Sequence, residues 1–90
     1  MMQGTDKQVT WATDIRRKAV AEATARFERT YKDADAAGQG EAFRRAAART
    51  LAMLEANEDA AWWINNVART DIKTWLNPIY QAALAAEGLA

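Results

Sequence analysis

The 90-residue sequence contains no cysteine and no histidine. Without cysteine the chain can form neither a disulfide nor a thiolate zinc site. The lack of histidine removes the commonest general base and the commonest metal ligand of enzymes. Only four glycines and one proline interrupt the chain. No segment alternates apolar and polar residues with β-branched enrichment, so strands are not expected.

Alanine-rich segments with helical spacing fill most of the chain, and we expect an all-α fold. The length fits a single helical domain over residues 1–90. We predict a small bundle of four to five helices, with one long N-terminal helix and shorter ones after it. A domain of this size buries only about 60–65% of its unfolded surface, so large side chains matter. We expect Trp11, Trp63 and Trp75 to lie in the core.

The first helix is expected to start at Thr5, because Thr5 and Gln8 have the spacing of a capping box. We predict that it runs to about residue 34. Residues at spacings of three and four mark its buried face, with one gap at Arg16. This stripe consists of Val9, Ala12, Ala19, Ala23 and Phe27.

Residues 33–40 contain two glycines and two aspartates and therefore predict a loop. A second helix is expected over about 41–56 and a third over about 58–67. Between them, Asn57 is predicted to end the second helix and also to act as the N-cap of the third.

The last helical segment is expected to begin near Asp71. The residue before a proline avoids helical geometry, which leaves two interpretations of the Asn77–Pro78 pair. Either Pro78 kinks the helix, or Asn77 is an N-cap with Pro78 as the first helical residue. Gly88 is the expected terminator of this segment.

Twelve basic and twelve acidic residues give a net charge of zero. Strong non-specific nucleic-acid binding depends on a basic excess and is therefore not favoured. No apolar run approaches the ~18 residues of a membrane helix, and the first residues lack the apolar stretch of a secretory signal. We expect a soluble cytoplasmic protein with no membrane partner.

Two basic clusters are candidate contacts for phosphates or for an acidic partner. The first cluster is Arg16, Arg17 and Lys18, and the second is Arg44, Arg45 and Arg49. Both have acidic neighbours within one helical turn. An ordinary solvated helix face is therefore the alternative interpretation.

Trp62 is the aromatic candidate for an interface. It lies next to Trp63, and two adjacent helix positions cannot both face one narrow core. Trp62 therefore either packs against the first helix or presents its ring, with Asn65 and Asn66, to a partner. Tryptophan is one of the residues enriched in the hot spots of protein interfaces.

Enzyme activity is not expected. The carboxylates are spread over amphipathic helices, and the GQG segment at 38–40 lacks the Gly-Lys-Ser/Thr of a phosphate loop. Asp33 and Asp35 come nearest to a metal site, but a solvated loop with a helix cap explains them more simply. We predict no metal and no cofactor.

Two stretches carry a family resemblance. Lys7, Gln8, Val9, Trp11, Ala12 and Ile15 form a K-Q-hydrophobic-x-W-A-x-x-I segment, and residues 59–66 read D-A-x-W-W-I-N-N. In the same order, these stretches resemble a loose group of small phage-borne and bacterial proteins that includes type I-E anti-CRISPR proteins of Pseudomonas phages. The resemblance implies an all-helical protein that blocks a CRISPR effector by binding, without catalysis, inside a bacterial host cell.

Three hypotheses result. The first is a phage or mobile-element inhibitor that binds a subunit of a type I CRISPR effector or its nuclease. The alternative is a small helical nucleic-acid-binding or regulatory module that uses the arginines of both clusters. The third is a structural or oligomerisation domain of a bacterial assembly. The sequence leaves the target, the binding face and the oligomeric state open.

Overall fold

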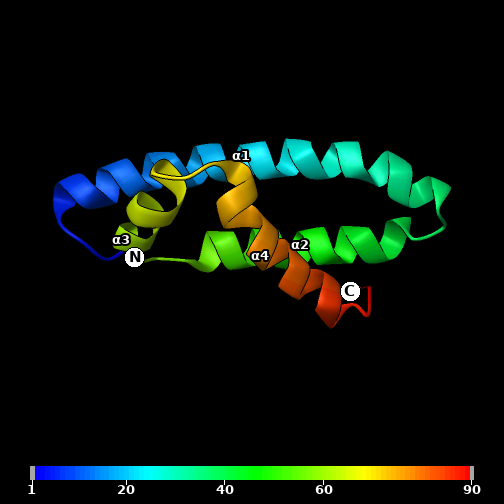
Figure 1. The fold of residues 1–90 in the computed structure, drawn as a ribbon. Helices are drawn as coiled ribbons and strands as arrows, with labels where there is room; N and C mark the ends of the chain where they lie inside the picture. Colours follow the sequence, from blue (N-terminus) through cyan, green and yellow to red (C-terminus); the bar gives the residue numbers. More distant parts are fainter. Residues whose placement is uncertain (1, 90) are drawn as a thin grey trace.

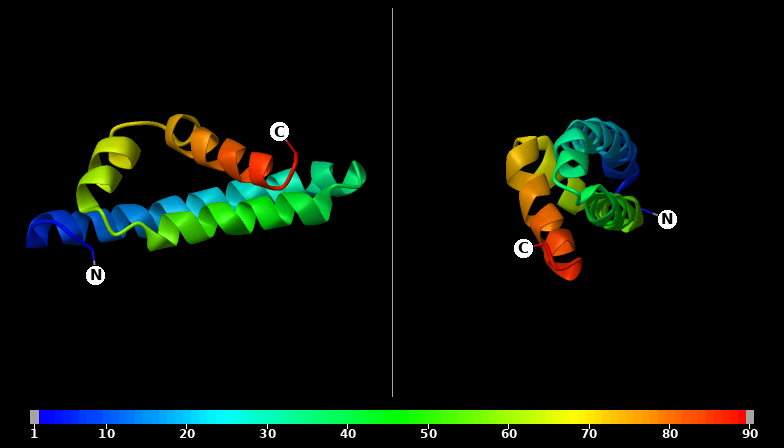
Figure 2. Two further views of the ribbon diagram at one scale, coloured as in Figure 1. Left: turned by 90° about the horizontal axis from the view of Figure 1, so that it is seen from below. Right: turned by 90° about the vertical axis from the view of Figure 1, so that its right-hand side faces the viewer.

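The computed structural model describes residues 2–89, and within them it contains helices and no strand. The elements are α1 (Asp6–Ala36), α2 (Gly40–Ala56), the short α3 (Ala60–Trp62), the π-helix η1 (Trp63–Ala68) and α4 (Ile72–Ala86). α1 and α2 form an antiparallel hairpin, and α3, η1 and α4 return across one face of it (Figure 1, Figure 2). The predicted all-α bundle with one long N-terminal helix is confirmed.

The capping box predicted at the start of the first helix is present. Thr5 Oγ1 accepts a hydrogen bond from the main-chain N–H of Gln8 (3.2 Å), and Gln8 Oε1 accepts one from the N–H of Thr5 (3.0 Å). Two donors that a helix N-terminus leaves unpaired are thereby satisfied. α1 continues to Ala36, slightly beyond its expected end. Gly38 follows with a φ of 75°, a conformation that side chains rarely adopt, and so allows the turn into α2.

Small side chains line the buried face of α1. Ala12, Ala19 and Ala23 of α1 are buried in one apolar core with Ala47 and Leu54 of α2. The separation of packed helices depends on the side chains between them, and alanine permits a close approach. The alanine stripe predicted for the first helix is therefore its buried face.

The tryptophans divide between core and surface. Trp63 is 0% exposed and Trp75 is 7% exposed, so both are core residues as predicted. Trp11 is 53% exposed, and its predicted place in the core is wrong. The reason is geometric, because successive helix residues are separated by about 100°. Ala12 points into the core, and its neighbour Trp11 therefore faces solvent.

α4 runs without a break through Pro78. Asp71 is its N-cap, so the alternative in which Asn77 caps a new helix is excluded. Trp75 before the proline and Leu84 after it are both buried. This packing on either side outweighs the hydrogen bond that a proline cannot donate.

Candidate protein-binding surface

Two segments that are far apart in the sequence meet at one end of the bundle. The first part of α1 packs against α3 and η1, so the stretches 7–15 and 59–66 lie together (Figure 1). Gln3 joins them. Its N–H donates to the carbonyl of Glu58 (2.6 Å), and its own carbonyl accepts from the N–H of Ala60 (3.0 Å). The residues that carry the sequence resemblance therefore form one structural unit.

Gly4 makes this junction sterically possible. Its φ of 151° lies in a region that side chains rarely adopt. A Cβ at this position would lie 3.0 Å from Cβ of Ala60 and 3.1 Å from Oε1 of Gln8, which belongs to the capping box. Glycine is therefore required for the chain to pass between α3 and the start of α1.

Arg16 fills the gap in the buried stripe of α1, and its guanidinium closes the end of α2. Nη1 donates to the main-chain oxygens of Glu55 and Asn57 and to Oε1 of Glu58, each at 3.3 Å. A helix C-terminus leaves carbonyl oxygens unpaired and attracts cations. The Arg16 side chain is only 25% exposed. Its guanidinium thus serves the fold at this end of the bundle.

Arg17 and Lys18, the other members of the first basic cluster, remain exposed. Both hold the carboxylate of Asp14, at 2.7 Å from Arg17 and 2.9 Å from Lys18. Hydrogen bonds from Lys18 and then Arg17 hold the pKa of Asp14 below its ordinary value. Exposed pairs of this kind contribute little to stability, and both cations remain accessible to a partner.

Arg44 is engaged across the turn between α1 and α2. It makes two hydrogen bonds to the carboxylate of Asp35 (2.7 and 2.9 Å), and its guanidinium lies 4.7 Å from the ring centroid of Tyr31. The hydrogen bond from Arg44 lowers the pKa of Asp35. A Cβ on Gly40 would lie 1.7 Å from Oδ1 of Asp35, so glycine leaves the space for this pair.

Arg45 and Arg49 fasten the end of α4 to α2. Glu87 accepts from Arg49 Nε (2.7 Å) and Arg45 Nε (3.0 Å), and the Glu87 side chain is only 11% exposed. Hydrogen bonds from Arg49 and Arg45 hold the pKa of Glu87 below its ordinary value. The second basic cluster therefore lies on the first half of α2, away from the end where α1 meets η1 (Figure 1). The two basic clusters do not come together in the fold.

Trp62 rests on the buried Trp63. Trp63 Nε1 donates to the carbonyl of Asn57 (2.9 Å), which fixes the indole beneath the surface. The two indole rings meet edge to face, with centroids 5.0 Å apart and an interplanar angle of 87°. Trp62 is half-buried, so it packs on the core and still presents part of its ring to solvent.

Asn65 and Asn66 are exposed on η1, three and four residues after Trp62. Asn66 Nδ2 donates to the carbonyl of Trp62 (2.9 Å), and the Asn66 carbonyl accepts from Thr70 Oγ1. Within residues 2–89 the Asn65 amide makes no hydrogen bond. π-Helical turns are rare and recur at functional sites. We call Trp62, Asn65 and Asn66 the η1 surface.

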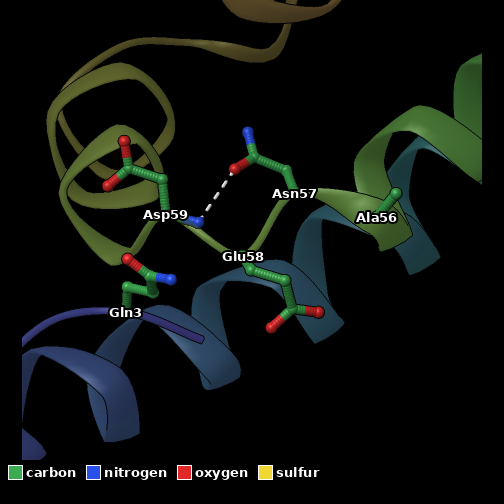
Figure 3. A pocket seen from close by; sticks show the side chains of 5 residues that line it. All are labelled: Gln3, Ala56, Asn57, Glu58 and Asp59. Atoms are coloured by element: carbon green, nitrogen blue, oxygen red, sulfur yellow. Dashed lines mark hydrogen bonds between the residues drawn. The ribbon is translucent and has the colours of Figure 1, made fainter. Parts of the chain in front are cut away.

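An open pocket of about 420 Å³ lies beside Gln3 (Figure 3). Its polar groups are used by the turn that leads into α3. Asn57 Oδ1 accepts from the N–H of Asp59 (3.0 Å), and Asp59 Oδ1 accepts from the N–H groups of Ala61 and Trp62. Asn57 ends α2 as predicted, but its predicted role as the next N-cap is wrong, because Asp59 caps α3.

Two features of this region were not predicted from the sequence. The structural role of Arg16 had a signal, namely the single basic residue in an otherwise apolar stripe. The exposure of Trp11 had only a weak signal, its position one residue before Ala12 in that stripe.

No family model, curated protein or solved structure matches this chain. Among residues 2–89, no helix has both the length and the apolar character that crossing a membrane requires. The same residues include no group of three or more acidic side chains that could hold a metal ion. The candidate surface is therefore defined by its own geometry, as a rigid end of a helical bundle with exposed polar and aromatic groups.

Proposed function

We propose that the protein acts by binding another protein, as a phage or mobile-element inhibitor that covers a functional surface of a type I CRISPR effector or its nuclease. No catalysis is involved, and the site of action is the cytoplasm of a bacterial host. The observation that carries this proposal is the packing of 7–15 against 59–66. These two stretches resemble type I-E anti-CRISPR proteins. The second stretch carries the η1 surface, and the first packs beneath it.

The geometry of the η1 surface suits tight binding. Trp63 and Arg16 fix its base through hydrogen bonds to Asn57, so little conformational entropy is lost when a partner docks. An exposed asparagine amide can both donate and accept a hydrogen bond. A partly exposed tryptophan supplies the apolar anchor that interface hot spots use. Arg17 would add an electrostatic contact with an acidic rim of the partner.

The nucleic-acid alternative draws less support. It rests on Arg16, Arg17, Arg44, Arg45 and Arg49, and each of these side chains makes an ion pair with a carboxylate of this chain. Phosphates would have to compete with those carboxylates. A gel shift at low salt tests this alternative, because a complex that rests on phosphate contacts is strongest there.

Binding to purified type I effector complexes tests the proposed function. Asn65→Arg should weaken binding by about tenfold or more, since a long charged side chain would block the η1 surface. Trp62→Ala should weaken it as well. Ala48→Arg, which adds the same charge at an exposed position of α2, is the matched control. Thermal unfolding monitors the fold of each variant.

Inhibition is measured in parallel, as plaque formation by a phage that a type I system targets. The wild-type chain and Ala48→Arg should restore plaques, and Asn65→Arg should not. If the wild-type chain neither binds nor protects against any type I system, the proposed function is wrong.

A further inference from the structure

The exposed Trp11 belongs to a continuous ridge along α1. Ala12, Ala19 and Ala23 point into the core, and residues at alternating spacings of three and four form a row about 100° around the helix from them. Ile15, Lys18 and Glu22 of this row line an open pocket together with residues of η1 and α4, so the η1–α4 segment borders the row. The α1 ridge consists of Gln8, Trp11, Ile15, Lys18, Glu22, Ala25, Arg29 and Lys32. All of these are exposed except Ile15, which is half-buried.

We propose that a second copy of this chain covers the α1 ridge, with the two α1 helices antiparallel. Spacings of three and four bring the ridge of one helix to face that of another. With the two-fold axis at the level of Val20, each ridge residue faces the one equally far on the other side. The facing pairs are Trp11 with Arg29, Ile15 with Ala25, Lys18 with Glu22, and Gln8 with Lys32. Two-fold symmetry makes each pair occur twice.

These pairs are chemically complementary. The Arg29 guanidinium can lie on the face of the Trp11 indole as a cation–π contact. Lys18 and Glu22 carry opposite charges on either side of the axis. Within residues 2–89, Glu22, Arg29 and Lys32 make no ion pair, so their charges are available to a partner. The ridge therefore matches a second copy of itself without any pair of like charges.

Other registers lack this match. A shift by one heptad in one direction places Lys18 opposite Arg29, which are both cations. A shift in the other direction places the Trp11 indole opposite the Glu22 carboxylate and Ile15 opposite Lys18, and it shortens the contact. The charges thus select one register, as flanking charges select pairings in coiled coils.

Sedimentation equilibrium of the full chain, from about 1 µM to about 1 mM, tests the proposal over the range in which moderate interfaces dissociate. The wild-type chain should form a dimer. Lys18→Glu places two carboxylates opposite each other, and Glu22→Lys places two ammonium groups opposite each other. Each single reversal should weaken the dimer by about tenfold or more. The double variant exchanges the two charges and should restore the wild-type dimer.

Lys18→Glu also loses its contact with Asp14, and the double variant shares this loss. Lys18 and Glu22 are also one helical turn apart in the same chain, so unfolding of each variant at low protein concentration measures the part of the effect that arises within one chain. Circular dichroism checks that all variants remain helical. A wild-type monomer throughout the range overturns the proposal. Single reversals that leave the dimer unchanged, or a double variant as weak as the singles, overturn it as well.

The dimer and the proposed inhibitory function can fail independently. The η1 surface is not part of the α1 ridge, so Asn65→Arg should leave the dimer intact. A chain that dimerises but binds no effector refutes only the proposed function. A chain that binds an effector as a monomer refutes only the dimer.

Discussion

The guanidinium of Arg16 lies 3.3 Å from the main-chain oxygen of Asn57, and so a residue in the first half of α1 closes the end of α2. The same group reaches the carbonyl of Glu55 and the carboxylate of Glu58. Trp63 Nε1 donates to the Asn57 oxygen as well. Residue 57 is therefore the point at which α1, α2 and the segment before η1 are tied together.

Arg16→Ala is expected to lower the free energy of unfolding by about 1–3 kcal/mol, because it removes the hydrogen bonds that the guanidinium donates to Glu55, Asn57 and Glu58 at the end of α2. Urea unfolding followed by circular dichroism measures the change. Arg17→Ala is the matched control, since Arg17 is exposed and, within residues 2–89, pairs only with Asp14. Its effect should stay within about 0.5 kcal/mol. Equal losses for the two variants would contradict the structural role of Arg16.

Trp63→Ala should cost about 3–5 kcal/mol of stability, because it empties a fully buried site and removes the hydrogen bond to Asn57. Trp11→Ala should cost about 0.5 kcal/mol or less, as at other exposed positions. Chemical unfolding at low protein concentration compares the monomers. A large loss for Trp11→Ala under those conditions would place its indole in the core after all.

The lowered pKa of Glu87 predicts that the fold loses stability in acid. Its pKa is lowered in the folded chain by Arg49 and Arg45, so it stabilises the fold above the pKa of an unfolded glutamate. That contribution is lost as the pH falls from about 4.3 through the lower folded value. Urea midpoints between neutral pH and pH 3 should therefore fall less for Glu87→Gln than for the wild-type chain.

Gly4→Ala should destabilise the fold more than Gly38→Ala. Both glycines have positive φ, so both variants carry backbone strain of about 1–3 kcal/mol. A Cβ on Gly4 would also press on Ala60, whereas a Cβ on Gly38 meets nothing within 4 Å. Thermal unfolding measures the difference. Equal losses would show that the contact with Ala60 relaxes freely.

Local patterns in the sequence predicted the helix ends well. The capping box of Thr5 and Gln8 starts α1, and Asn57 ends α2. Their hydrogen bonds span about one helical turn, so they depend little on the rest of the fold. The alanine stripe likewise identified the buried face of α1, because a buried face repeats with the helical period.

The remaining features depend on tertiary contacts that no local pattern contains. The width of the buried face of α1 is set by where η1 packs, and this decides that Trp11 is exposed. The acceptors of Arg16 lie about forty residues away in the sequence, at the end of another helix. Pro78 stays within α4 because residues on both sides are buried. The η1 surface was proposed from the sequence, and its role in binding stays a prediction.

The exposure of Trp11 also gives the protein an optical reporter of its own. Trp63 and Trp75 are shielded from water, so their emission lies toward the blue, while that of Trp11 lies toward the red and is open to quenchers such as acrylamide. Trp62 also presents part of its ring to solvent, so titrating the quencher in a Trp62→Phe background isolates the signal of the one indole on the α1 ridge. Whatever covers that ridge would protect this signal, and its arrival can be followed in real time without attaching any label.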